Sequence, residues 1–186
     1  MSNFGFLQAE WPELHREAVH AERLSYADPR ASAFYARRVL ELAVTWMFEA
    51  DDTLKLPYQD DLAALIAEPT LVKVAGPAIR AKMDVIRRQG NAAVHRKTPI
   101  APKDAVRTVA ELFHVLYWMA RTYTRDQAQL PASTLAFDTA LIPRPVPAEV
   151  RIAKQAELKA QAEKYAEQDA ALAAERKKNQ DLDAEI

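Results

Sequence analysis

Apolar residues recur three and four positions apart along most of the chain, and this spacing constrains the fold more than any other feature of the sequence. Side chains at that spacing lie on one face of an α-helix, so each such segment predicts an amphipathic helix. We find no convincing alternation of apolar and polar residues of the kind that marks a half-buried strand, and no two-residue hairpin turn. The sequence therefore predicts an all-α fold, a bundle of about five helices.

Prolines indicate where several of these helices begin, since proline is favoured at the first helical position. The pair Asp28-Pro29 is the strongest start signal, an N-cap residue followed by proline, and it precedes a segment that is apolar around most of its circumference. We expect that segment to be the central helix. The expected helices cover residues 12–25, 34–48, 59–67, 79–94 and 103–123.

Three regions follow from the change in composition along the chain. Residues 1–124 form the expected bundle, and residues 125–147 form a proline-containing connector whose Phe137, Leu141 and Ile142 could pack against it. Residues 148–186 are rich in Ala, Glu and Lys and predict a long protruding C-terminal helix. One apolar residue per heptad favours a solvated single helix over a coiled coil. Since the pattern continues to Ile186 without a stop signal, we expect this helix to be truncated.

Charge and composition exclude several classes of function. Lys and Arg number 25 against 26 Asp and Glu, so bulk charge gives no argument for non-specific nucleic-acid binding. Cysteine is absent, and His15 and His20 do not share a helical face, so no metal site is expected. No glycine-rich phosphate loop is present, so no cofactor is expected within this chain. Without a leader or a membrane-spanning segment, we expect no membrane association and a cytoplasmic location.

The segment from Ile86 to His95 concentrates the polar residues that could perform a function. At helical spacing Gly90 falls on the apolar stripe, where a glycine permits close approach of another helix. Arg88, Asn91 and His95 fall on the opposite stripe. Arg88 and His95 are two turns apart, about 10 Å, so their side chains could share one phosphate or carboxylate.

Four blocks of the sequence are distinctive: residues 34–43, residues 56–58 with Leu62, residues 86–95 and residues 112–121. Together they resemble the helical domain at the N-terminus of one branch of type I restriction enzyme R subunits. The resemblance spans about residues 1–124, including the opening segment from Phe6 to Pro12. In that family a helical connector, a nuclease domain and a superfamily 2 helicase motor follow. The resemblance implies a parent protein that uses ATP and Mg²⁺, acts on DNA, and assembles with modification and specificity subunits.

The same domain resembles the HEPN superfamily, whose ribonuclease members have an arginine, a polar residue and then a histidine after a short gap. Arg88, Gln89 and His95 match this pattern at its longest separation. Two hypotheses follow: a non-catalytic docking or nucleic-acid-sensing surface formed by Arg87, Arg88, Asn91 and His95, or a metal-independent ribonuclease. In the second, a homodimer would use His95 as acid or base and Arg88 to stabilise the phosphorane. The simpler alternative is a solvated face in which Asp84 pairs with arginine.

Overall fold

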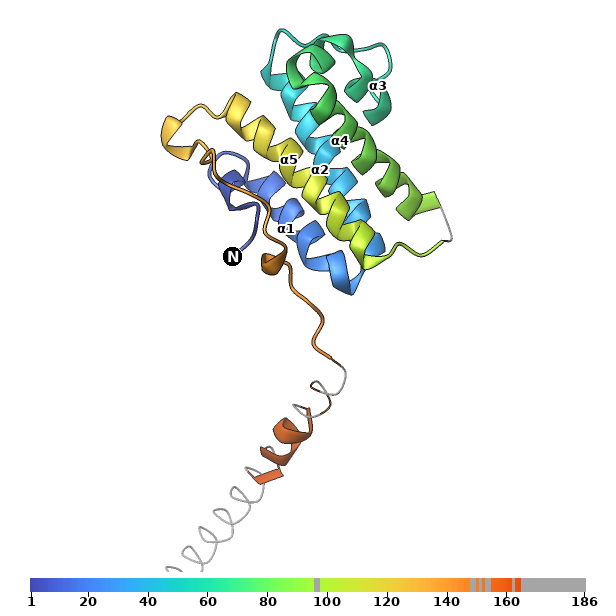
Figure 1. Ribbon diagram of the computed structural model, residues 1–186, viewed down its shortest axis with the longest axis vertical. Helices are drawn as coiled ribbons and strands as arrows, with labels where there is room; N and C mark the ends of the chain where they lie inside the picture. Colours follow the sequence, from blue (N-terminus) through green and yellow to red (C-terminus); the bar gives the residue numbers. More distant parts are fainter. Residues whose placement is uncertain (96–97, 148–149, 151, 153–154, 162, 165–186) are drawn as a thin grey trace, which may run out of the picture. The chain divides into compact units, whose positions relative to one another are not determined.

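The computed structural model describes residues 1–95, 98–147, 150, 152, 155–161 and 163–164. The chain divides into two units, Met1–Arg144 and Pro145–Ile186, and each is described by itself. The described residues are helical or irregular and contain no strand, which confirms the prediction of an all-α bundle. The first unit contains α1 (Pro12–Ala27), α2 (Pro29–Ala50), α3 (Leu62–Ala67), α4 (Pro69–His95) and α5 (Pro102–Tyr123) (Figure 1).

Local chemistry sets the starts of these helices. The Asp28 carboxylate accepts a hydrogen bond from the Ala31 amide at 3.0 Å, and Pro29 follows it, so α2 begins where this pair predicted a start. α3 is shorter than expected because Asp61, and not a residue near Gln59, is its N-cap. The Asp61 side chain accepts hydrogen bonds from the amides of Ala63 and Ala64 at 2.8 and 3.0 Å.

α4 begins earlier than expected and bends at Gly76. The expected helix at 79–94 is its second part, and a preceding turn that buries Leu71 was not predicted. Gly76 has φ 78° and ψ 165°, a left-handed conformation that side chains disfavour. Glycine thus permits the bend, and the second part of α4 begins at Pro77.

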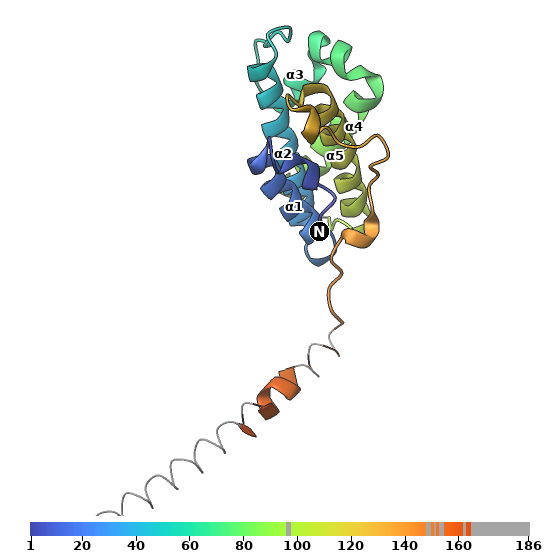
Figure 2. The same cartoon turned by 90° about the vertical axis from the view of Figure 1, so that its left-hand side faces the viewer.

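α2 is the centre of the bundle, as its apolar circumference predicted. It packs against α1, α3, α4 and α5, and Figures 1 and 2 show α3 at the end where α2 finishes and α4 begins. The interior combines large apolar side chains from all five helices. Among the fully buried ones are Leu40, Met47, Ile66, Leu71, Met83, Ile86, Leu112, Phe113, Leu116 and Met119.

The N-terminal segment joins α1 to the connector through a buried carboxylate, Glu22, which is 1 % exposed. Its oxygens accept hydrogen bonds from the Ser2 hydroxyl, the Asn3 amide at 3.1 Å and the Asn3 side-chain nitrogen at 2.6 Å. Asn3 also exchanges two hydrogen bonds with the backbone of Asp138, at 2.9 and 2.7 Å. One polar cluster therefore fixes three segments that are distant in sequence.

The connector packs on the bundle, as its apolar residues suggested. Ile142 is 3 % exposed, and the Phe137 ring lies 5.6 Å from that of Phe113 on α5. Two short 3₁₀ turns, Gln127–Gln129 and Thr139–Leu141, interrupt it. The first unit consequently extends through the connector to Arg144.

In the second unit residues 145–147 are irregular, the other described residues are helical, and Leu158 is exposed. The expected heptad positions from Tyr165 to Ile186 lie outside the described residues. No helix in the described part of the chain combines the length and the apolar character needed to cross a membrane.

Replacement of Glu22 tests the polar cluster. We expect Glu22→Ala to lower the free energy of unfolding by about 1–3 kcal/mol, because Ser2 and Asn3 would keep buried donors without an acceptor. Urea denaturation at neutral pH measures this. Glu49→Ala, which removes an exposed carboxylate from α2, should have little effect. Equal stabilities of the two variants would contradict the assignment.

Candidate functional site

Gly90 sets the rotation of α4, because α2 passes directly over it. A Cβ atom added at Gly90 would lie 2.2 Å from Cβ and 2.7 Å from Cδ of Arg37. Only glycine fits at such a distance. Met83, Ile86 and Ala93 are buried on the same side of the helix, so the predicted apolar stripe is confirmed.

The other side of α4 carries an ion-pair cluster centred on Asp84. Its two carboxylate oxygens lie 3.0 Å from Nη2 of Arg87 and 2.9 Å from Nη2 of Arg88. The Arg87 side chain is 23 % exposed, whereas that of Arg88 is 73 % exposed. Arg87 is therefore mainly a structural partner of Asp84, and Arg88 is available to a ligand.

Opposing effects act on the Asp84 carboxyl. Burial raises its pKa, but the hydrogen bond from Arg87 and the charges of Arg88, Arg87 and Arg80 lower the pKa further than burial raises it. The net shift is downward. Asp84 is thus ionised at neutral pH and holds both guanidinium groups over the helix.

An open hollow of about 410 Å³ lies beside this cluster and is lined by Arg88, Gln89, Asn91, Ala92 and His95. The structure brings Arg88, Asn91 and His95 to one surface, as their spacing predicted. Arg87 does not line the hollow. We call the surface formed by the five lining residues the α4 face.

Arg30, in the first turn of α2, holds the end of α4 that carries His95. Its Nη1 donates to the Ala93 carbonyl at 2.6 Å and its Nη2 donates to the Thr98 carbonyl at 3.0 Å. The last carbonyls of a helix have no partners within it, so an arginine from a neighbouring helix stabilises them. Sequence reasoning missed Arg30, and its position gives no signal of this role.

The α4 face can bind an anionic or hydrogen-bonding group. Arg88 supplies a cation, Asn91 and Gln89 supply amides, and His95 supplies an exposed imidazole. In the described part of the chain no side chain hydrogen-bonds to His95 to orient it, whereas general acid–base catalysis usually has such a partner. The described residues also contain no group of three or more His, Asp or Glu side chains that could hold a metal ion.

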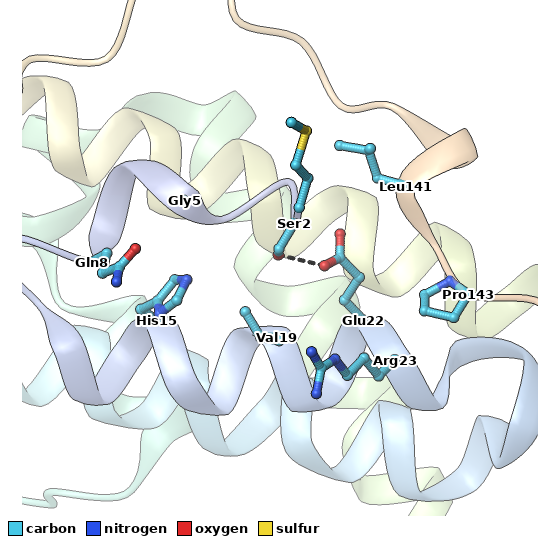
Figure 3. A pocket seen from close by; sticks show the side chains of 10 residues that line it. Ser2, Gly5, Gln8, His15, Val19, Glu22, Arg23, Leu141 and Pro143 are labelled. Atoms are coloured by element: carbon cyan, nitrogen blue, oxygen red, sulfur yellow. Dashed lines mark hydrogen bonds between the residues drawn. The ribbon is translucent and has the colours of Figure 1, made fainter.

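A second hollow, of about 610 Å³, lies between the N-terminal segment, α1 and the connector (Figure 3). His15 and Arg23 line it from α1, Gln8 faces His15, and Leu141 and Pro143 come from the connector. The spacing of residues along the sequence did not predict this hollow. Only Glu22 could have indicated it, because a carboxylate on the apolar stripe of α1 needs buried polar partners.

Other polar residues of α1 and α2 have structural partners. His20 is exposed and stacks on Tyr35 with ring centres 5.0 Å apart. Arg38 lies 3.5 Å from Glu17 on α1, whereas Arg37 lies 3.7 Å from Glu41.

The position of His114 beside Phe113 on an amphipathic helix favours a packed or boundary histidine, whereas the structure exposes its side chain. Its side chain is 46 % exposed, and its Nδ1 lies 3.5 Å from Nζ of Lys82. Lys82 also pairs with Glu111 at 2.5 Å, so the three side chains form a surface cluster between α4 and α5.

These features define an all-α domain with a polar surface on a rigidly held helix. Residues 19–168 match the family model described as a domain of unknown function, DUF4145, and the chain belongs to this family. No curated protein and no solved structure matches the chain.

Gly90→Ala tests the rotation of α4. Alanine has the higher helix propensity by about 1 kcal/mol, so at an exposed position the change would stabilise the protein. Here the new methyl group would overlap Arg37, and we expect a loss of about 1–3 kcal/mol in the free energy of unfolding. Thermal and urea denaturation measure it, with Gly5→Ala, where no atom lies within 4 Å, as the control. A Gly90→Ala variant more stable than the wild type would contradict the close packing of Arg37 against Gly90.

Asp84→Asn tests the ion-pair cluster through its pH dependence. Because the folded-state pKa of Asp84 is lowered, the carboxylate contributes stability fully above its ordinary value of 3.8 and loses that contribution as the pH falls below it. We expect the free energy of unfolding of the wild type to exceed that of the variant by about 0.5–1 kcal/mol at pH 7, the modest size reflecting solvent screening, and the difference to shrink as the pH falls below 3.8. Urea denaturation across this range gives the difference. Asp52→Asn, an exposed control, should show no such gap, and a gap at Asp84 independent of pH would contradict the assignment.

Proposed function

We propose that this chain is a non-catalytic docking domain of a type I restriction enzyme R subunit and that the α4 face is its contact surface. The observation that carries the proposal is the fixed presentation of Arg88, Asn91 and His95 in one open hollow. Asp84 fixes Arg88, Gly90 fixes the rotation of the helix, and Arg30 fixes its end. A surface held in this way loses little conformational freedom on binding, which favours association.

The blocks that resemble R subunits support this proposal by their position. Phe34–Ala43 lies on α2, Ile86–His95 on α4 and Leu112–Arg121 on α5, and these three helices pack against one another. The contact of Arg37 with Gly90 joins two of the blocks. The resemblance therefore concerns residues that form the bundle and position its α4 face.

The partners in this proposal are the modification and specificity subunits of a cytoplasmic restriction complex. An acidic group on either subunit would pair with Arg88 and accept hydrogen bonds from Asn91. DNA, ATP and Mg²⁺ would be bound by the nuclease and motor domains of the parent protein, as the resemblance implies. This chain would contribute assembly and not chemistry.

A metal-independent ribonuclease of HEPN type is the second candidate. One observation favours it: Arg88, Gln89 and His95, the residues of the HEPN pattern, line the same hollow. Two copies of the chain would have to join their hollows, with His95 transferring the proton and Arg88 stabilising the phosphorane. Among the described residues no side chain hydrogen-bonds to His95 to orient it, which weighs against catalysis by this imidazole.

The double variant Arg88→Ala/His95→Ala tests the docking proposal. Both side chains are exposed, so we expect an unchanged melting temperature but weakened co-elution with a purified complex of modification and specificity subunits. Arg107→Ala/His114→Ala removes the same residue types from exposed positions on α5 and should assemble as the wild type does. Normal assembly of the Arg88 and His95 variant would rule out the α4 face as the docking surface.

The ribonuclease candidate is tested with the same proteins. Wild-type chain is incubated with single-stranded RNA in the presence of a chelator, and we expect no cleavage. Cleavage that disappears in His95→Ala, but persists in His114→Ala, would overturn the docking proposal in favour of catalysis.

A further inference from the structure

Two adjoining hollows form a groove along α2, well separated in sequence from the α4 face. The first, of about 470 Å³, lies between the start of α1 and α2, and the second, of about 360 Å³, lies between α2 and the segment around α3. Thr45 and Glu49 line both hollows, so the two hollows lie next to each other along α2. We call this surface the α2 groove.

The α2 groove has acidic walls. Its lining contains the carboxylates Glu10, Glu13, Glu41, Glu49 and Asp60, and no lysine or arginine lines either hollow. Of these five carboxylates, only that of Glu41 has an ion-pair partner among the described residues, Arg37 at 3.7 Å. Carboxylates gathered without cations repel one another, so a cationic ligand would relieve the repulsion.

Only one of the two Glu10 carboxylate oxygens has a hydrogen-bond partner among the described residues. One carboxylate oxygen accepts a hydrogen bond from the Arg125 amide at 3.2 Å. The other oxygen, Oε1, is buried and has no hydrogen-bond partner among the described residues. An anionic acceptor without a hydrogen-bond partner is energetically costly.

The floor of the α2 groove is apolar and rigid. Trp46 is half-buried and meets the ring of Trp11 edge to face, with centres 5.3 Å apart and planes at 90°. Tyr123 supports Trp46 from α5 at 5.8 Å. Leu42 continues this floor in the first hollow, and Leu65 lies in the second. An indole face bordered by carboxylates suits both alkyl chains and cations.

Exposed apolar side chains extend the groove at its α3 end. Leu56 lines the second hollow and is 71 % exposed, and Tyr58, two residues further on, is fully exposed. Large apolar side chains that project into solvent next to a groove are typical of protein contact surfaces.

We propose that the α2 groove docks a basic segment of a partner protein, one that combines Lys or Arg with large apolar side chains. The cations would pair with Glu41, Glu49 and Asp60, and the apolar side chains would pack on Trp46 and Leu56. Nucleic acid does not fit, because its phosphates would meet carboxylates. The inference does not depend on the proposed docking through the α4 face, since the two surfaces share no lining residue.

The probe is a fluorescently labelled amphipathic peptide built from leucine and lysine, titrated with the full chain and followed by anisotropy. We expect Glu41→Gln/Glu49→Gln to weaken binding by about tenfold, the loss of two partly exposed charge pairs. Glu157→Gln/Glu163→Gln removes the same charge from described, exposed positions in the second unit and should change the dissociation constant less than about twofold.

Three outcomes would overturn the proposal. The first is equal weakening by the two double variants, which would show attraction to net charge alone. The second is equally tight binding of a peptide in which serine replaces leucine, which would show that the apolar floor takes no part. The third is tight binding of a peptide in which glutamate replaces lysine. Arg88→Ala/His95→Ala should bind the peptide as the wild type does. The proposal for the α4 face and the proposal for the α2 groove can therefore be refuted independently.

Discussion

The rest of the structure depends on the contact between α2 and α4 at Gly90. A Cβ there would lie 2.2 Å from that of Arg37, so α4 cannot rotate about its axis or move closer without a clash. Arg30, on the same helix as Arg37, holds the carbonyls at the end of α4. The orientation of Arg88, Asn91 and His95 toward solvent is a consequence of these two contacts from α2. The same contacts from α2 therefore pack the core and hold the polar side of α4 toward solvent.

The periodicity of the sequence predicted the all-α class, the central position of α2 and the inward direction of Gly90, because these follow from which residues share a helical face. The bend at Gly76, the role of Arg30 and the cluster around Glu22 were not predicted. Each depends on segments distant in sequence that meet only in the folded chain. His114 is exposed although it adjoins Phe113, since neighbouring residues on a helix point about 100° apart.

Net charge conceals how this protein distributes its charged groups. The formal value of −1 results from 25 basic and 26 acidic residues. The structure separates them: the α4 face has a guanidinium and an imidazole, whereas the α2 groove is lined by carboxylates without a lysine or arginine. We propose that one bundle contacts two chemically different partner surfaces. Such separation sets specificity more than affinity, since each surface repels the other's ligand.

The absence of cysteine from the chain makes one direct measurement possible. Asn91→Cys would place a single thiol in the hollow of the α4 face, and its rate of reaction with a maleimide reports whether that hollow is covered. We predict that adding the complex of modification and specificity subunits strongly slows labelling of this cysteine, while a cysteine introduced at Ser133 in the exposed part of the connector reacts at the same rate as before. Undiminished labelling at position 91 in an assembly shown by co-elution to contain this chain would contradict docking through the α4 face.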